Sequence, residues 1–62
     1  MFKIKEYREE LNMSQEELAR KSKISRTIIS GLETGTISVT TTKTLKAIAE
    51  ALGKDVSEIF LL

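Results

Sequence analysis

The sequence predicts a compact all-α domain built from five short helices. Apolar residues recur at the three- and four-residue spacing of helices, and side chains that cap helix starts precede them. The chain contains no proline, and asparagine or glycine stands where several of these helices are expected to end. Its 62 residues leave room for one domain at most, which we expect to span residues 1–62.

The first helix is predicted over roughly residues 4–11, and Asn12 suits the left-handed residue that ends a helix. Three apolar side chains of this segment share one helical face: Ile4, Tyr7 and Leu11. Ser14 then opens a capping box, in which its hydroxyl accepts the backbone N–H of Glu17 and the glutamate reaches back to Ser14. A second helix is expected from this box to about Lys21.

A turn through residues 22–24 leads to a third helix, with Ser25 as its cap and its end near Gly35. The second and third helices and the turn between them carry apolar side chains that are expected to pack together at a steep crossing: Leu18, Ala19, Ile24, Ile29 and Leu32. Such a crossing presents the N-terminal half of the third helix outward, where it can enter a major groove about 12 Å wide.

Residues 35–41 are predicted to form a loop that ends in a threonine cap, although residues 39–42 are all β-branched, because a lone strand has no partner here. The fourth helix is expected from about Thr42 and ends at Gly53. Its apolar residues follow the helical period: Leu45, Ile48, Ala49 and Leu52. A second capping box, at residues 55–58, opens a short last helix.

The net charge of +1 is distributed unevenly along the chain. Residues 18–49 carry six basic side chains and one acidic one, a net charge of +5, whereas residues 1–17 and 50–62 each carry −2. A concentration of positive charge is expected of a surface that binds a polyanion. An ordinary solvated surface is the alternative interpretation.

Composition argues against several other functions. Without cysteine or histidine, the chain can form no disulfide or thiolate zinc site and has no imidazole to transfer protons. Since no nucleophile has a base beside it, we expect no catalytic activity, no cofactor, no metal and no small-molecule substrate. No apolar run approaches the roughly 20 residues of a membrane span, and the N-terminus lacks the apolar stretch of a secretory signal. We therefore expect a cytoplasmic protein without a membrane partner.

Three stretches, residues 14–21, 24–30 and 33–35, resemble the Cro and phage-repressor (Xre-like) type of helix-turn-helix transcriptional regulators. The similarity extends to Arg8 and to residues 45–59, and so covers nearly the entire chain. It implies the phage-repressor type of DNA-binding domain, with the helix-turn-helix in the second and third helices. It also implies a sequence-specific regulator of transcription that binds double-stranded DNA, acting as a repressor and as a homodimer on a near-palindromic operator.

The resemblance also implies roles for individual residues. Gln15 matches the residue that grips a phosphate and braces the start of the recognition helix. Arg26 and Thr27 match the positions that reach base edges, and an arginine there can donate to both O6 and N7 of guanine. Further DNA contacts are expected from the turn, the helix cap, the recognition helix and the segment that follows it: Lys23, Ser25, Ser30, Thr36, Ser38 and Lys43.

Four positions depart from the family pattern. Gly31 stands where members usually have a longer side chain that contacts a base, and Ile28 stands where an outward-facing small polar residue is usual. Lys23 occupies a position that typically holds a left-handed glycine, a conformation that costs other residues roughly 1–2 kcal/mol. Ser22 occupies a usually apolar position, which predicts a loosely packed hinge between the two helices.

Two further contacts are expected, one from the resemblance and one from the exposed apolar character of the C-terminal tail. Arg8 and Glu33 match an ion pair that ties the first helix to the end of the recognition helix. Self-association is expected at the apolar tail, through Phe60, Leu61 and Leu62. Two alternative functions stay open: an antitoxin of the same fold that also binds a toxin protein, and a protein-interaction module that has lost DNA binding.

Overall fold

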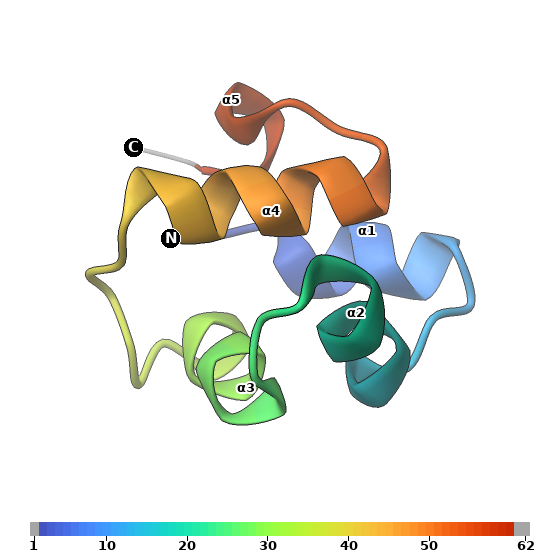
Figure 1. The fold of residues 1–62 in the computed structure, drawn as a ribbon, viewed down its shortest axis with the longest axis horizontal. Helices are drawn as coiled ribbons and strands as arrows, with labels where there is room; N and C mark the ends of the chain where they lie inside the picture. The colour runs from blue at the N-terminus through green and yellow to red at the C-terminus, as the bar shows by residue number, and fades with distance from the viewer. Residues whose placement is uncertain (1, 61–62) are drawn as a thin grey trace.

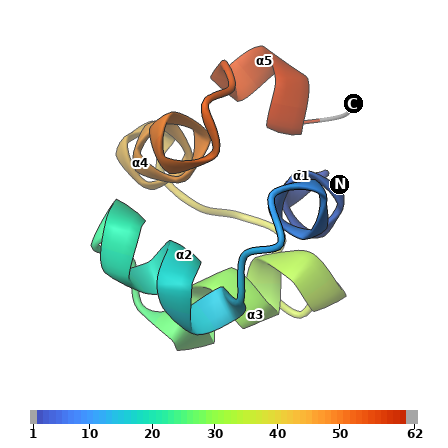
Figure 2. The same ribbon diagram turned by 90° about the vertical axis from the view of Figure 1, so that its right-hand side faces the viewer.

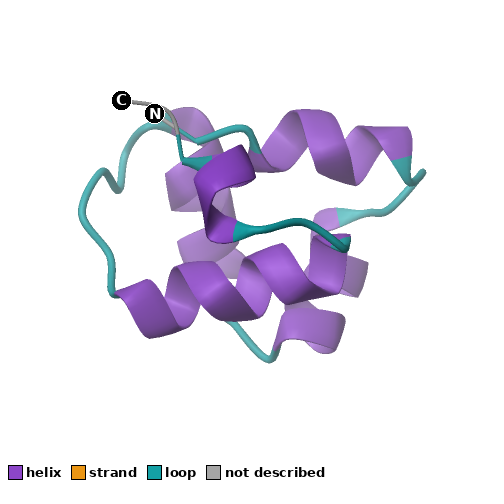
Figure 3. Ribbon diagram, turned by 90° about the horizontal axis from the view of Figure 1, so that it is seen from above, coloured by secondary structure: helices purple, strands orange, loops and turns teal. Residues whose placement is uncertain are grey.

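Five helices follow one another within residues 2–60, which confirms the predicted all-α fold class. The computed structural model describes residues 2–60. The helices are α1 (Ile4–Glu10), α2 (Gln15–Ser22), α3 (Arg26–Thr34), α4 (Thr42–Leu52) and α5 (Val56–Ile59). Loops join them (Figure 3), and Phe2 and Phe60 form an isolated antiparallel bridge. Each helix within residues 2–60 is too short or too polar to cross a membrane.

The helices enclose one apolar interior. In Figure 1, α4 crosses the middle of the molecule, with α5 above it and α2 and α3 below it. Figure 2 shows α1 and α4 nearly end-on, on opposite sides of that interior. Every helix contributes at least one buried apolar side chain: Ile4, Met13, Leu18, Ile29, Leu32, Leu45, Ile48, Ala49, Leu52 and Ile59 form the core, with Met13 coming from the α1–α2 turn. Since burying one leucine-sized side chain contributes about 2 kcal/mol, this shared core fixes how α2 and α3 sit on the rest.

Hydroxyl side chains begin three of the helices, as the sequence predicts. Ser14, Ser25 and Thr41 each accept the backbone N–H of the residue three positions further on, at 3.0, 3.2 and 3.1 Å. These bonds satisfy N–H groups that have no partner within the helix. At α5, Glu58 accepts the backbone N–H of Asp55 at 3.0 Å, and the predicted capping box is formed.

The capping box predicted at Ser14 forms only one of its two hydrogen bonds, the one that the Ser14 hydroxyl accepts. The Glu17 carboxylate, expected to reach back to Ser14, instead pairs with the Lys21 ammonium at 3.5 Å, one helical turn further on. Both groups lie on the solvent-facing side of α2, where such i, i+4 pairs form readily.

The end of α1 corrects the predicted inner face of that helix. Asn12 adopts the left-handed conformation expected of it, with φ of 52°. The helix ends at Glu10, so Leu11 lies in the turn and is 51% exposed. Met13 is buried in its place, because the left-handed residue directs the chain inward just before α2.

Candidate nucleic-acid interface

One face of α3 is exposed to solvent, whereas the opposite face is held in the core. Arg26 and Thr27 are exposed. Further along the helix, Ile29, Gly31 and Leu32 are buried. Because Ile29 and Leu32 lie on the inner face of α3, three residues apart, their burial turns the polar residues of the first turn outward. The side chains at this end are therefore free to meet a ligand.

The turn between α2 and α3 is well packed, which corrects the expectation of a loose hinge. Ser22 is buried, and its hydroxyl donates to the Leu18 carbonyl at 2.7 Å and accepts the Ile24 N–H at 3.2 Å. Lys23 adopts the left-handed conformation, with φ of 61°. The serine thus satisfies the backbone of the turn with its own hydroxyl, where an apolar residue could only fill space.

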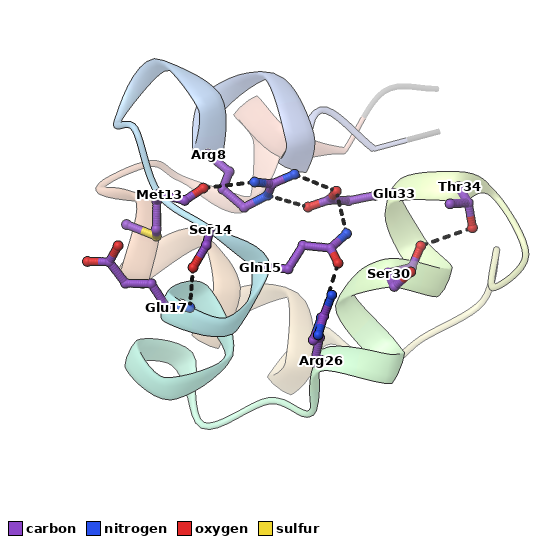
Figure 4. Close-up of polar contacts among 9 residues, drawn as sticks. All are labelled: Arg8, Met13, Ser14, Gln15, Glu17, Arg26, Ser30, Glu33 and Thr34. Atoms are coloured by element: carbon purple, nitrogen blue, oxygen red, sulfur yellow. Dashed lines mark hydrogen bonds and ion pairs between the residues drawn. The ribbon is translucent and has the colours of Figure 1, made fainter.

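Arg8 and Glu33, which the resemblance pairs, meet in a two-pronged contact between α1 and the end of α3 (Figure 4). Arg8 Nε donates to Glu33 Oε2 at 2.8 Å, and Arg8 Nη2 donates to Oε1 at 3.0 Å. The third nitrogen, Nη1, donates to the Met13 carbonyl at 2.8 Å. The two charged side chains are only 11% and 3% exposed. All three guanidinium nitrogens thus have an acceptor, as a buried arginine requires.

This environment alters the protonation of both groups. Burial alone raises the pKa of the Glu33 carboxyl, but the hydrogen bonds from Arg8 and Gln15, together with the charges of Arg8 and Lys5, outweigh it, so the pKa of Glu33 lies below its ordinary value. The hydrogen bond to Glu33 in turn raises the pKa of Arg8. Both groups are therefore charged at neutral pH.

Gln15 links this buried pair to the exposed end of α3. Its Nε2 donates to Glu33 Oε1 at 3.0 Å, and its Oε1 accepts Arg26 Nε at 3.4 Å. Arg26 Nη1 also lies 3.4 Å from Glu16 Oε1. Figure 4 shows the resulting chain of polar contacts, which runs from Arg8 through Glu33 and Gln15 to Arg26. The first residue of α2 thereby connects the buried pair to the exposed Arg26 side chain.

A shallow groove follows the outer face of α3. Five of the residues that the sequence singled out line it, together with Gly31 and Thr34: Gln15, Arg26, Thr27, Ser30 and Thr36. Its walls offer guanidinium, amide and hydroxyl groups, which are the donors and acceptors that contact base edges and phosphates. The groove therefore suits a ligand that is rich in hydrogen-bond donors and acceptors.

The sequence profile of the helix-turn-helix family HTH_3 matches residues 4–59. The chain belongs to this family. It is therefore a DNA-binding helix-turn-helix protein, of the Cro and phage-repressor type that the resemblance indicates. The match extends from the first residue of α1 to the last residue of α5, so it includes both helices that flank α2 and α3. Neither a curated protein nor a solved structure gives a significant match to the chain.

The helix-turn-helix groove does not include every residue expected to contact DNA. Lys23 and Ser25 are exposed in and beside the turn, next to the groove's Arg26 end. Ser38 instead lines an apolar cleft, with Phe2 and Val39 among its neighbours. Lys43 is exposed in the first turn of α4. Of the residues expected to contact DNA, five therefore line the groove and the others lie outside it.

Two departures on the recognition helix have structural explanations. Ile28, expected on the outward face, is half-buried and packs against the core, because the first turn of α3 leans on its neighbours. Gly31, expected among the base-contacting positions, is buried beneath the side chain of Ile37. Neither position offers a free side chain to a base.

The predicted self-association site lies only partly within the described residues. Phe60 is 40% exposed, but its ring packs against Phe2 with centroids 5.3 Å apart, so it is not wholly available to a partner as expected. Leu61 and Leu62 lie outside the described residues.

Sequence reasoning missed two residues near the groove. Glu16 places a carboxylate beside Arg26, and the acidic character of the first turn of α2 was the available signal. Thr34 donates to the Ser30 carbonyl at 2.9 Å and its hydroxyl lies 3.0 Å from that of Thr36. A threonine four residues after a helical carbonyl commonly makes the first of these bonds.

Proposed function

We propose that this protein is a transcriptional repressor that binds a near-palindromic operator as a homodimer, without catalytic activity. The observation that supports it most directly is the groove on α3. It gathers Arg26, Thr27 and Ser30 of α3 in one groove, which Gln15 and Thr36 also line. A helix with such a face fits the major groove, and occupation of a promoter is the simplest route to repression.

Each groove residue has a proposed role. Arg26 exchanges its long, exposed contacts with Gln15 and Glu16 for the O6 and N7 atoms of a guanine. Thr27 and Ser30 offer hydroxyls to neighbouring bases or to the backbone. The Gln15 amide carries two hydrogens, of which Glu33 accepts one, and we assign the other to a phosphate oxygen.

The remaining DNA contacts in this proposal position the protein on the backbone. Lys23 and Ser25 meet phosphates beside the turn, and Thr36, Ser38 and Lys43 meet them beyond the recognition helix. Contacts of this kind fix orientation and carry little sequence information.

The homodimer is proposed because one recognition helix covers only a half-site. Two copies whose α3 helices lie about 34 Å apart would contact successive major grooves. We place the dimer contact where the sequence predicts it, at the C-terminal Phe60, whose side chain is 40% exposed. A Phe60→Asp variant should shift the sedimentation of a dimer toward that of a monomer at equal concentration.

The proposal is tested by selecting duplexes from a random pool with the wild-type protein and with Arg26→Ala. The wild type should enrich an inverted repeat, and the variant should lose preference at one position of each half-site, at about 1–3 kcal/mol. Arg20→Ala, which removes an exposed arginine from α2, is the matched control and should keep the preference. A wild-type pool that stays unenriched at low salt would contradict sequence-specific binding.

A further inference from the structure

Gly31 forms a notch in the middle of the recognition helix, and Ile37 fills it. A Cβ atom at position 31 would lie 2.5 Å from Ile37 Cδ1, 2.6 Å from Cγ1 and 3.2 Å from Cβ. These distances are shorter than van der Waals contact, so a side chain at position 31 and the present position of Ile37 exclude each other. A glycine within a helix costs up to about 1 kcal/mol relative to alanine. Here it admits the segment that follows α3.

The same two residues are joined through the backbone. The Ile37 N–H donates to the Gly31 carbonyl at 2.9 Å, and Gly35 turns the chain between them with φ of 86°. Thr36 therefore stands on a short arc that is attached at both ends, and it lines the groove together with Gln15. The chain thus folds back onto α3 at Ile37 before it continues to α4.

The hydroxyls of Thr34 and Thr36 contact each other, and the other bond of Thr34 decides which of them donates. Thr34 carries one hydrogen, and its Oγ1 lies 2.9 Å from the Ser30 carbonyl. When that hydrogen is donated to Ser30, Thr36 must be the donor in its 3.0 Å contact with Thr34. The Thr36 hydrogen can then rotate from Thr34 toward a ligand in the groove. Residues 34–41 contain no lysine or arginine, so a contact made by this segment is uncharged.

We propose that Ile37 is a positioning residue, which by occupying the Gly31 notch holds the Thr36 hydroxyl where it donates to a DNA phosphate. The inference rests on the proposed function, because it assigns a contact within that interface. It explains how a recognition helix that lacks a base-contacting side chain at position 31 still contributes to affinity there. It also predicts a neutral contact, which releases no counterion.

The first test compares Thr36→Val and Ile37→Ala with Val39→Ala, a matched truncation of an 85% exposed side chain in the same segment. The probe is the duplex that the wild type enriches from the random pool, titrated at several salt concentrations. Thr36→Val and Ile37→Ala should each weaken binding about tenfold, the usual worth of a hydrogen bond to a charged group. The slope of log affinity against log salt should stay unchanged, and Val39→Ala should bind within about twofold of wild type.

The second test uses the mutual exclusion at the notch. Gly31→Ala should weaken binding about as much as Thr36→Val, because the added methyl displaces Ile37 and the arc with it. Adding Ile37→Ala to Gly31→Ala should cause little further loss, since both changes disturb the same contact. Circular dichroism melting identifies a temperature at which every compared variant is folded. Should Ile37→Ala not fold, Thr36→Val and Gly31→Ala decide the question.

The outcomes separate the two proposals. If the wild type binds its selected duplex and Thr36→Val and Gly31→Ala bind it equally well, Ile37 only fills space and the inference is wrong while the proposed function stands. Additive losses for positions 31 and 37 would also overturn it. If the wild type enriches no duplex, the proposed function itself fails.

Discussion

The two ends of the recognition helix each meet an ion pair, and the pairs differ in almost every physical respect. At the C-terminal end, Glu33 and Arg8 meet at 2.8 Å with side chains 3% and 11% exposed. At the N-terminal end, Arg26 and Glu16 meet at 3.4 Å with side chains 61% and 76% exposed. The first pair is bidentate and shares its charges with Met13 and Gln15, whereas water solvates most of the second.

The difference teaches which end of α3 is fixed and which is available. A buried pair loses hydration that only its partner replaces, so separating it is costly. An exposed pair contributes about 0–1 kcal/mol, and water or a phosphate can replace either partner. An arginine–glutamate pair thus sets the orientation of α3 at its C-terminal end. At the N-terminal end, the same kind of pair can open so that Arg26 contacts DNA.

Removing the buried carboxylate should have the largest effect. Glu33→Gln leaves the Arg8 guanidinium mostly buried without a countercharge, and we expect a loss of about 3 kcal/mol in the free energy of unfolding. Urea denaturation measures it. Glu50→Gln, which alters an exposed carboxylate on α4, is the matched control and should change stability by less than about 0.5 kcal/mol. A loss below about 1 kcal/mol at position 33 would mean that the pair is not the fixed end.

Part of the contribution of Glu33 to the free energy of unfolding should depend on pH. The folded pKa of Glu33 lies below its ordinary value, because the bonds from Arg8 and Gln15 and nearby positive charge outweigh the effect of burial. The stability it confers is therefore complete above the unfolded pKa of about 4.3 and is lost as pH falls from there through the folded pKa. The difference between wild type and Glu33→Gln should narrow over that acidic range. Urea denaturation between about pH 7 and pH 3 measures it, and a difference that stays constant would contradict the assignment.

Changing only the shape of the cation should have a smaller effect. Arg8→Lys keeps the charge but cannot donate to both Glu33 oxygens and the Met13 carbonyl at once. We expect a loss of about 1–2 kcal/mol in the free energy of unfolding. Arg20→Lys, on the exposed face of α2, controls for the intrinsic effect of the substitution. Equal losses at the two positions would show that geometry contributes nothing to the pair.

The helices could be predicted from the sequence because their signals are local. The serine and threonine caps, Asn12 and Gly53 each act within one turn, and the structure places them as expected. Met13 escaped notice although its position was readable. It precedes the Ser14 cap and lies five residues before Leu18, the spacing of a hydrophobic staple, and both are buried.

The candidate site was less predictable because its parts are distant in the sequence. From the sequence alone, Gly31 indicates only a missing base contact. Its second role, as the space that Ile37 fills, depends on a residue six positions later in the chain. The packing of the turn at Ser22 likewise depends on hydrogen bonds to Leu18 and Ile24. A family preference for an apolar residue at this position does not predict those bonds. Periodicity identifies which face of a helix is apolar, but it does not show which loop closes over it.

The exposed pair provides the last comparison, with the smallest effect on stability. Glu16→Gln removes a contact between two largely solvated groups, so the free energy of unfolding should change by less than about 0.5 kcal/mol. DNA binding should become tighter in this variant. Without the carboxylate, Arg26 loses a competing partner and a negative charge leaves the neighbourhood of the phosphates, so affinity for the selected duplex should rise about threefold at low salt and less at high salt.

A matched pair of backgrounds separates these two causes. In Arg26→Ala, Glu16→Gln can act only through its distance from the phosphates, so the rise that remains there measures repulsion, and the rise that disappears measures competition for Arg26. Glu10→Gln, an exposed carboxylate at the end of α1, should leave affinity unchanged in both backgrounds. A fall in affinity for Glu16→Gln would mean that the carboxylate orients Arg26 for the base, and the N-terminal pair would then be a fixed end like the other.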